Sequence, residues 1–325
     1  CCLWQQPTIF SKKGCAVMSS MIYKKKSPLV LFLLPAFAFL IAYLYYPFLQ
    51  NICNTFLNIG GLGRAAQGLN SPWYENYSRI LTDPDLRTAL KNTVLLTVCT
   101  VVFQVGIALI LALLVDSIRV GSKVFRTVYF FPIVISATAL GLMFNLMFLY
   151  KGGMVNQLLL KLGLLATETK AGGKLVVQWL DWKDSSHFLF TMFMPVVWQY
   201  VGFYFVILIT GLNNIPGELF EAAALDGASG LKKIRYVTLP LLRNVLCTCL
   251  VLAITGALKV FDLPWVMFGA GMPQNQGWLT GTYMYDQTFN KMNVDYGSTI
   301  AVLIVVLGVV LSNVANRVFQ PAEDY

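Results

Sequence analysis

Between two long apolar segments of this chain lies one polar stretch, Ile215-Pro-Gly-Glu-Leu-Phe-Glu-Ala-Ala-Ala-Leu-Asp-Gly-Ala-Ser229, which runs on to Thr238-Leu-Pro240. Pro216 suits the first turn of a helix, and Glu218 and Glu221 suit the positive end of its dipole. The three alanines after Glu221 favour a helix that another backbone can approach closely. We expect Gly227 to end this helix and Ser229 to cap a second one. The stretch therefore predicts a helix–glycine–helix outside the membrane, joined rigidly to membrane helices at both ends.

The composition indicates a membrane protein. Of the 325 residues, 57% are hydrophobic and only 12% are charged, whereas about a quarter of a soluble domain is charged. A transmembrane helix needs about twenty mostly apolar residues. Six stretches reach that length: 29–49, 90–115, 124–150, 188–212, 245–268 and 299–319. We expect an all-α integral membrane protein with six transmembrane helices over 28–319, a loop over 213–240 between spans four and five, and tails over 1–27 and 320–325.

The net charge of +9 is placed as in a membrane protein. Basic residues cluster beside the ends of spans on one side, as in Lys24-Lys25-Lys26 before the first span and Lys232-Lys233 in the polar stretch. This is the distribution that the positive-inside rule describes. It predicts that both termini and the Glu221 loop are cytoplasmic, and it argues against a nucleic-acid partner.

The polar stretch resembles a known motif. Glu221-Ala-Ala, Gly227 four residues after Ala223, and Leu239-Pro240 look like the EAA loop of the membrane subunits of binding-protein-dependent ABC importers. The flanking residues Trp198-Gln199, Gly211-Leu212 and Ile215-Pro-Gly-Glu-Leu219 resemble the carbohydrate-uptake branch, the maltose and glycerol-phosphate type. The resemblance covers about residues 27–319. One departure is Phe268-Gly-Ala-Gly-Met-Pro273, where the family usually has Thr-x-Gly-Gly-Pro.

This resemblance implies a permease subunit in a bacterial plasma membrane. Its partners would be a second homologous permease, two ATP-binding subunits, an extracellular solute-binding protein and the lipid bilayer. ATP and Mg²⁺ would bind to the partner ATPases, and this chain would hold no cofactor of its own. The residues implied in coupling to the ATPases are Glu218, Glu221, Ala222, Ala223, Asp226, Gly227, Leu239 and Pro240.

A substrate pathway is expected along the fourth span and its neighbours. Aromatic rings beside a few hydrogen-bonding groups suit a sugar, although helix packing explains the same residues. Lys259 and Asp262 stand one turn apart and could pair within the fifth span or reach water at its outer end. The candidates are Asn145, Trp198, Gln199, Tyr200, Tyr204, Lys259 and Asp262. In the preceding outer loop, 154–163 has the apolar spacing of a helix on the membrane surface.

The sequence contains no motif for chemistry of its own. Gly227-Ala-Ser-Gly-Leu-Lys232 lacks the spacing of a phosphate-binding loop, and His187 is the single histidine, without a cluster of metal ligands. The chain is therefore expected to be a transporter subunit and not an enzyme, importing a sugar or oligosaccharide. The alternatives are an importer of glycerol phosphate, a polyamine or a peptide, an ion-coupled secondary carrier, for which only Asp262 is a candidate acid, and a scaffold or sensor subunit.

Overall fold

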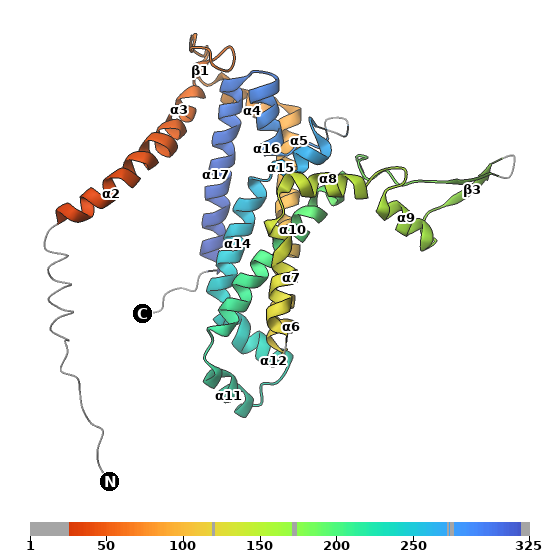
Figure 1. Cartoon of the computed structure of the whole chain (residues 1–325). Coiled ribbons are helices and arrows are strands. Elements are labelled where there is room, and N and C mark those ends of the chain that lie inside the picture. The colour runs from red at the N-terminus through yellow and green to blue at the C-terminus, as the bar shows by residue number, and fades with distance from the viewer. Residues whose placement is uncertain (1–25, 119–120, 171–173, 272, 274–275, 320–325) are drawn as a thin grey trace. The chain divides into compact units, whose positions relative to one another are not determined.

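The computed structural model describes residues 26–118, 121–170, 174–271, 273 and 276–319, so most of both expected tails lies outside the described residues. The regular structure of the described residues consists of helices and two short antiparallel hairpins (Figure 1). β1 (Leu57–Asn58) pairs with β2 (Gly68–Leu69), and β3 (Thr167–Lys170) pairs with β4 (Lys174–Val177). The chain divides into two units, residues 1–53 and 54–325, which we describe separately.

The described part of the first unit is one long apolar helix. It consists of α2 (Lys26–Leu40), the π-helix η1 (Ile41–Tyr45) and α3 (Tyr46–Asn54). The segment Leu29–Asn54 is long and apolar enough to cross a membrane, and none of it is buried within the chain. Such a helix needs an apolar environment around it, which lipid supplies.

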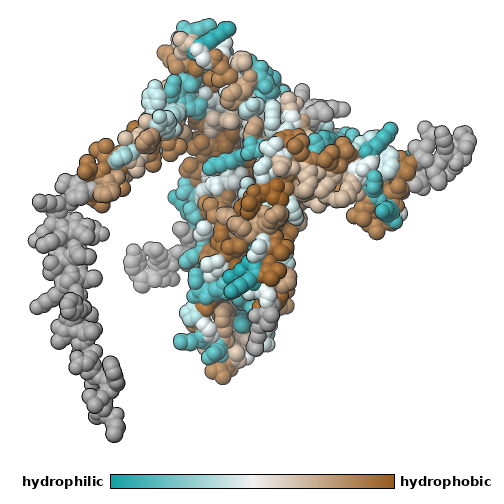
Figure 2. Space-filling model, in the orientation of Figure 1, coloured by the Kyte–Doolittle hydropathy of each residue, from teal (hydrophilic) through white to brown (hydrophobic). Residues whose placement is uncertain are grey.

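The second unit contains four more helices that satisfy the length and composition of a membrane span. These are Pro84–Asp116, Phe188–Asn213, Arg243–Phe268 and Val294–Phe319. The first comprises α5 (Pro84–Thr100), the π-helix η2 (Val101–Val105) and α6 (Gly106–Asp116), and the others are α10 (Phe188–Asn213), α14 (Arg243–Leu258) with α15 (Asp262–Phe268), and α17 (Val294–Phe319). Apolar surface extends along these upright helices (Figure 2). The described residues thus hold five candidate spans, or six if one bent pair counts as a span.

The bent pair replaces the single continuous span expected over 124–150. α7 (Ser122–Val134) and α8 (Ala137–Met147) meet at 93°. Pro132 weakens the helix before the bend because it has no N–H to donate. Ser136 then caps α8, its hydroxyl accepting the Ala139 N–H at 3.2 Å. A cap starts a new helix, and the chain changes direction at Ile135.

The fifth span is interrupted as well. α14 ends at Leu258 and α15 begins at Asp262. Pro264 cannot donate an N–H to the carbonyl of Val260, so a continuous helix through this point would lose a hydrogen bond. α8 and α15, the two helices that follow the breaks, pack closely together: a Cβ atom built on Gly141 would lie 2.9 Å from Val266 Cβ.

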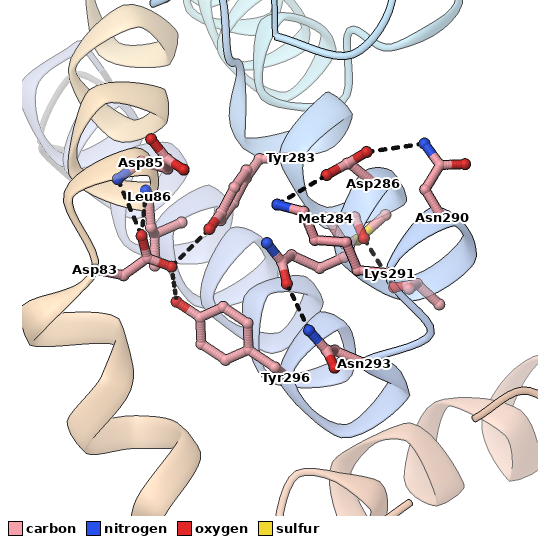
Figure 3. Close-up of polar contacts among 12 residues, drawn as sticks. Asp83, Asp85, Leu86, Tyr283, Met284, Asp286, Asn290, Lys291, Asn293 and Tyr296 are labelled. Carbon is pink, nitrogen blue, oxygen red and sulfur yellow. Dashed lines mark hydrogen bonds and ion pairs between the residues drawn. The ribbon is translucent and has the colours of Figure 1, made fainter. Parts of the chain in front are cut away.

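At the end of the bundle opposite α11 (Gly217–Leu225), short helices form a polar layer (Figure 1). These are α4 (Glu75–Thr82), α16 (Thr280–Tyr285) and the π-helix η4 (Asp286–Asn290). Asp83 joins the layer together (Figure 3): its Oδ2 accepts the hydroxyls of Tyr283 and Tyr296, each at 2.7 Å. Its Oδ1 accepts the first backbone N–H groups of α5.

These contacts set the acidity of Asp83. Partial burial raises the pKa of its carboxyl, but the hydrogen bonds from the two tyrosine hydroxyls and from the α5 backbone outweigh burial. The pKa of Asp83 therefore lies below its ordinary value. Burial, followed by the hydrogen bond to Asp83, raises the pKa of Tyr283. Asp83 thus remains a charged acceptor that ties α5, α16 and α17 together.

The expected helix within 154–163 is confirmed as α9 (Met154–Lys161). Asn156 of α9 is completely buried, and its amide donates to the carbonyls of Leu149, Tyr150 and Leu180 at 3.3, 2.9 and 2.9 Å. Its Oδ1 accepts the indole N–H of Trp182 at 3.0 Å. One side chain therefore fixes α9 to the segment after α8 and to the segment before α10.

Candidate functional site

The Glu-Ala-Ala stretch forms a short helix beyond the end of the bundle (Figure 1). In α11, Pro216 precedes the first turn and Glu218 lies within it, so the proline stands one position earlier than expected. Gly227 has φ +79°, a left-handed conformation that glycine adopts at no steric cost. The Ala228 N–H closes the helix end on the Ala223 carbonyl at 2.9 Å. The glycine therefore ends the helix, as the sequence indicates.

The second helix begins at a different residue from the one expected. α12 (Leu231–Lys233) follows Gly230, and no side chain caps it, so the expected cap by Ser229 is wrong. The π-helix η3 (Ile234–Thr238) and α13 (Leu239–Leu241) then lead into α14. Gly230 has a positive φ of 54°, which reverses the chain without a polar cap.

The surface of this segment combines acidic, small and apolar side chains. Leu225 is 90% exposed and Leu231 is 83% exposed, which is unusual for leucines outside a membrane. Ala223 packs inward and is buried. The exposed expected coupling residues are Glu218, Glu221, Ala222, Asp226, Gly227 and Pro240, and Leu239 is half-buried. An acidic and apolar surface of this kind is suited to contact with another protein.

Both ends of the segment join the bundle at one tightly packed point. Gly211 near the end of α10 lies so close to α14 that a Cβ atom there would be 3.0 Å from Leu242 and from Val245. Leu212 and Leu242 are buried in the same apolar cluster. A force on α11 would therefore reach α10 and α14 together.

Those two helices and α5–η2 enclose a cavity of about 170 Å³. Tyr200 and Tyr204, both expected in the pathway, lie on its wall. The α14 residues on the wall stand one helical turn apart in the sequence. Three of them, Ala253, Gly256 and Ala257, have small or no side chains, which leaves space for the cavity. The remaining lining residues are Thr100, Gln104, Ile133, Val196, Phe203, Leu252 and Val260. Rings, hydroxyls and an amide thus meet in one mainly apolar site.

Two buried glutamines hold the backbone around this cavity. Gln104, in the π-helix η2, donates its amide to the Val196 carbonyl at 2.8 Å. Gln199 donates to the carbonyl of Ile135, at the bend between α7 and α8, at 3.3 Å. Because an unpaired carbonyl is costly inside a membrane bundle, Gln199 stabilises the break. Gln199 is therefore placed at a backbone group and not on the cavity wall.

Of the two alternatives for Lys259 and Asp262, pairing with each other or reaching the surface, the structure shows exposure and no ion pair between them. α14 ends between them, so the helical spacing that would align them is lost. Both side chains are exposed, and the ion pair found among the described residues joins Lys291 to Asp286 instead, at 3.2 Å. Lys259 lines a groove of about 440 Å³ between α14 and α17, with Asn313 further along it.

Trp198 and Asn145 lie away from the cavity. Trp198 contacts the ring of Phe144 with centroids 5.8 Å apart and lines an apolar groove of about 700 Å³ between η2–α6, α7 and α10. Asn145 Oδ1 accepts the Lys183 ammonium at 2.7 Å. Burial lowers the pKa of Lys183, with the nearby Asp181 carboxylate opposing it. Of the seven expected pathway residues, the structure brings Tyr200 and Tyr204 together in one cavity.

Sequence reasoning missed ten of the twelve residues on the cavity wall, among them Thr100, Gln104 and Gly256. Thr100 and Gln104 stand four residues apart in an otherwise apolar run, which is a signal for a shared polar face. The π-helix at η2 is not visible in the sequence, and it changes the direction of Gln104. Gly256 carries no such signal, because a glycine in an apolar span is equally typical of helix packing.

Comparison with known proteins agrees with this architecture. A probable ABC transporter permease, YurN of Bacillus subtilis, is 32% identical over 94% of this chain and all of its own length. The arabinooligosaccharides transport permease AraP of Halalkalibacterium halodurans is 32% identical, covering 82% of this chain and 80% of AraP. A crystal structure of a bacterial ABC transporter that imports alginate shares the fold, with a TM-score of 0.75 at 19% identity over 93% of this chain and 98% of that one.

The family comparison covers the bundle and the segment around α11. Residues 104–324 match the model of the binding-protein-dependent transport system inner membrane component, which is more than half of the chain. The family expected from the sequence is thereby confirmed by a match over a far longer stretch than the polar segment. The chain belongs to the family of inner membrane components of binding-protein-dependent transport systems.

Proposed function

We propose that this chain is a permease subunit of an ATP-driven importer and that, with a second permease, it forms the pathway for a sugar or oligosaccharide. The observation that carries this proposal is the position of α11, exposed beyond the bundle and joined by short segments to α10 and α14, which line the cavity. The solute class is supported by the relative AraP and by the tyrosine and hydroxyl groups of the cavity.

A second permease is supported by what one chain leaves incomplete. The cavity of about 170 Å³ is smaller than the roughly 300–1,000 Å³ of typical ligand sites. The exposed face of α14 also carries Thr248 and Gly256, and the exposed ammonium of Lys259 follows the helix, a charge that lipid would not stabilise. A homologous subunit on this face would complete the site and cover these groups.

The coupling residues act through α11. Two ATP-binding subunits would bind and hydrolyse ATP with Mg²⁺, each holding one such helix of the permease pair. Glu218, Glu221 and Leu225 would contact the ATPase, while the small side chains of Ala222 and Ala223 allow close approach. Closure of the ATPases would move α10 and α14 as rigid bodies and open the pathway to the other side.

The sidedness follows from charge. Lys232, Lys233 and Arg235 adjoin α11, and the positive-inside rule places such clusters in the cytoplasm. Both termini would share this side of a bacterial plasma membrane. A solute-binding protein would deliver the substrate at the opposite end, near α4 and α16.

An importer of glycerol phosphate or a polyamine would use the same α11. A secondary carrier would instead need ion-binding acids in its spans, and Asp262 is exposed after the break in span five. Uptake that requires ATP but no ion gradient separates an ABC importer from a carrier. Competition by unlabelled sugars, glycerol phosphate and spermidine separates the solute classes.

The experiment compares two glycines in proteoliposomes that contain the complete transporter. Gly227 and Gly163 both have positive φ, +79° and +69°, and a Cβ atom on either meets no neighbour. Valine at either position therefore costs similar backbone strain, about 1–2 kcal/mol or more. We expect Gly227→Val to insert normally and lose ATP-driven uptake. Gly163→Val, in the loop after α9 and away from α11, should retain uptake. Equal uptake by the two variants would contradict the proposal.

A further inference from the structure

Four aromatic rings form a continuous row from the polar end layer to the break in span five. Phe289 of η4 contacts Tyr285, with ring centroids 4.7 Å apart. Tyr285 contacts Phe261 and Trp265, both at 4.8 Å. Phe261 and Trp265 stack on each other at 5.6 Å with an angle of 24° between the rings. The row therefore joins η4, α16 and α15.

The row ends beside the cavity. Phe261 follows Val260, which lines the cavity wall. α16 lies close to this point, since a Cβ atom on Gly281 would be 3.1 Å from the Val260 carbonyl oxygen. At the other end, Phe289 is 45% exposed. A molecule that moved along the rings would pass from the surface to the break at Val260.

The row differs from the buried tyrosines beside it. Tyr283 and Tyr296 are buried and donate their hydroxyls to Asp83 (Figure 3). Tyr285, two positions after Tyr283, is half-exposed, and its hydroxyl has no hydrogen-bond partner among the residues that the structure describes. Packing and hydrogen bonding account for Tyr283 and Tyr296 but leave the hydroxyl of Tyr285 free.

A free carboxylate follows the inner end of the row in the sequence. Asp262 comes directly after Phe261, is exposed, and has no ion-pair or hydrogen-bond partner in the described part of the chain, whereas Lys259 lines the separate groove between α14 and α17. A sugar ring has C–H faces that stack on aromatic rings and hydroxyls that need donors and acceptors. The rings of the row and the Asp262 carboxylate supply both kinds of contact.

We propose that Phe289, Tyr285, Trp265 and Phe261 form a saccharide-stacking site that conducts sugar rings from the outer end of the chain to the cavity. This inference rests on the proposed function, because it assumes that the solute is a saccharide. The Asp262 carboxylate accepts hydrogen bonds from the hydroxyls of a ring that has reached Phe261. An oligosaccharide is the best fit, since successive rings of one molecule contact successive aromatic side chains.

The test measures direct binding, because uptake constants also depend on the solute-binding protein. The complete membrane complex, without that protein, is placed in nanodiscs and titrated with lactose, α-1,5-arabinotriose or maltotriose in saturation-transfer-difference NMR. Phe289→Leu and Tyr285→Leu each remove one stacking face and keep an apolar side chain. The matched control is Trp73→Leu, an exposed ring (59%) in a separate aromatic cluster with Phe56 and Tyr74.

We expect at least one of these saccharides to bind the wild type, with the strongest transfer to its C–H protons. Phe289→Leu and Tyr285→Leu should raise its dissociation constant about threefold to tenfold, the range of one aromatic contact. Phe289→Trp should retain binding, and Trp73→Leu should leave it unchanged. ATP-driven uptake of the same three saccharides is measured in parallel.

The outcomes separate the two proposals. If the wild-type transporter imports none of these saccharides and its uptake is competed only by non-sugar solutes, the proposed function fails and this inference fails with it. If uptake is normal but the wild type gives no saturation transfer, or Phe289→Leu binds as well as Trp73→Leu, the stacking site alone is refuted.

Discussion

The contact between α7 and α10 allows a sharp prediction, because it depends on one glycine. A Cβ atom on Gly202 would overlap the Tyr129 carbonyl and lie 3.0 Å from Phe130 Cα, both backbone groups that cannot rotate away. Gly202→Ala must therefore push the two helices apart. Overpacking a tight core costs about 1–3 kcal/mol, and a backbone collision belongs at the upper end, about 3 kcal/mol.

A loss of this size is measurable as thermal stability. At about 2–4 °C per kcal/mol, the unfolding midpoint of Gly202→Ala should fall by about 6–12 °C. The assay is fluorescence-detected size-exclusion chromatography of the heated complex. Gly106→Ala is the matched control, since its added Cβ would meet no neighbour and alanine favours the helix. If Gly202→Ala has the same unfolding midpoint as Gly106→Ala and the wild type, α7 and α10 do not approach each other as closely as described.

Two further predictions concern the polar groups outside the spans. Asn156→Ala leaves three carbonyls and the Trp182 N–H without their buried partner and should cost about 3 kcal/mol or more, whereas Gln157→Ala, at an exposed position, should melt as the wild type does in the same assay. The pKa of Asp83 is lowered by folding, so its stabilisation is complete above the ordinary value of 3.8 and is lost as the pH falls through the folded pKa. The midpoint difference between wild type and Asp83→Asn should therefore shrink as the pH drops below about 4, and a difference independent of pH would contradict this assignment.

The sequence predicts the helix at α11 and its end at Gly227, because proline, alanine and glycine have strong local preferences that the surroundings do not override. The first residues of other helices are predicted less accurately. The span expected from residue 90 begins at Pro84 instead. Asp83 caps the helix there, and the polar residues between Pro84 and residue 90 form its first turns. Polar residues at the start of a span are not excluded from a helix when they lie outside lipid.

The breaks in spans three and five show where sequence reasoning stops. Both were present as signals, Pro132 with Ser136 and Pro264 after Asp262, but a proline predicts a kink and not an angle of 93°. The angle depends on the packing of α8 against α15, which is a tertiary contact between distant segments. The break in span five also removes the helical spacing that would have placed Lys259 and Asp262 on one face.

The candidate pathway was predicted only in part for a related reason. Tyr200 and Tyr204 share a helix face by spacing, so their common cavity follows from the sequence. Gln199 and Asn145 have the same polar character but serve the Ile135 carbonyl and Lys183. Side-chain type identifies a hydrogen-bonding group, and only the fold decides whether its partner is a solute or the protein itself.

The most direct test of the account asks what touches α11 in the assembled transporter. A photo-cross-linking amino acid is placed at Leu225, which is 90% exposed, and at Leu69, which is 70% exposed at the other end of the bundle. The account predicts that in intact cells Leu225 cross-links to a nucleotide-hydrolysing subunit and Leu69 does not. Cross-linking of Leu225 to an extracellular protein, or of neither position to an ATPase, would contradict the claim that α11 receives the work of ATP hydrolysis.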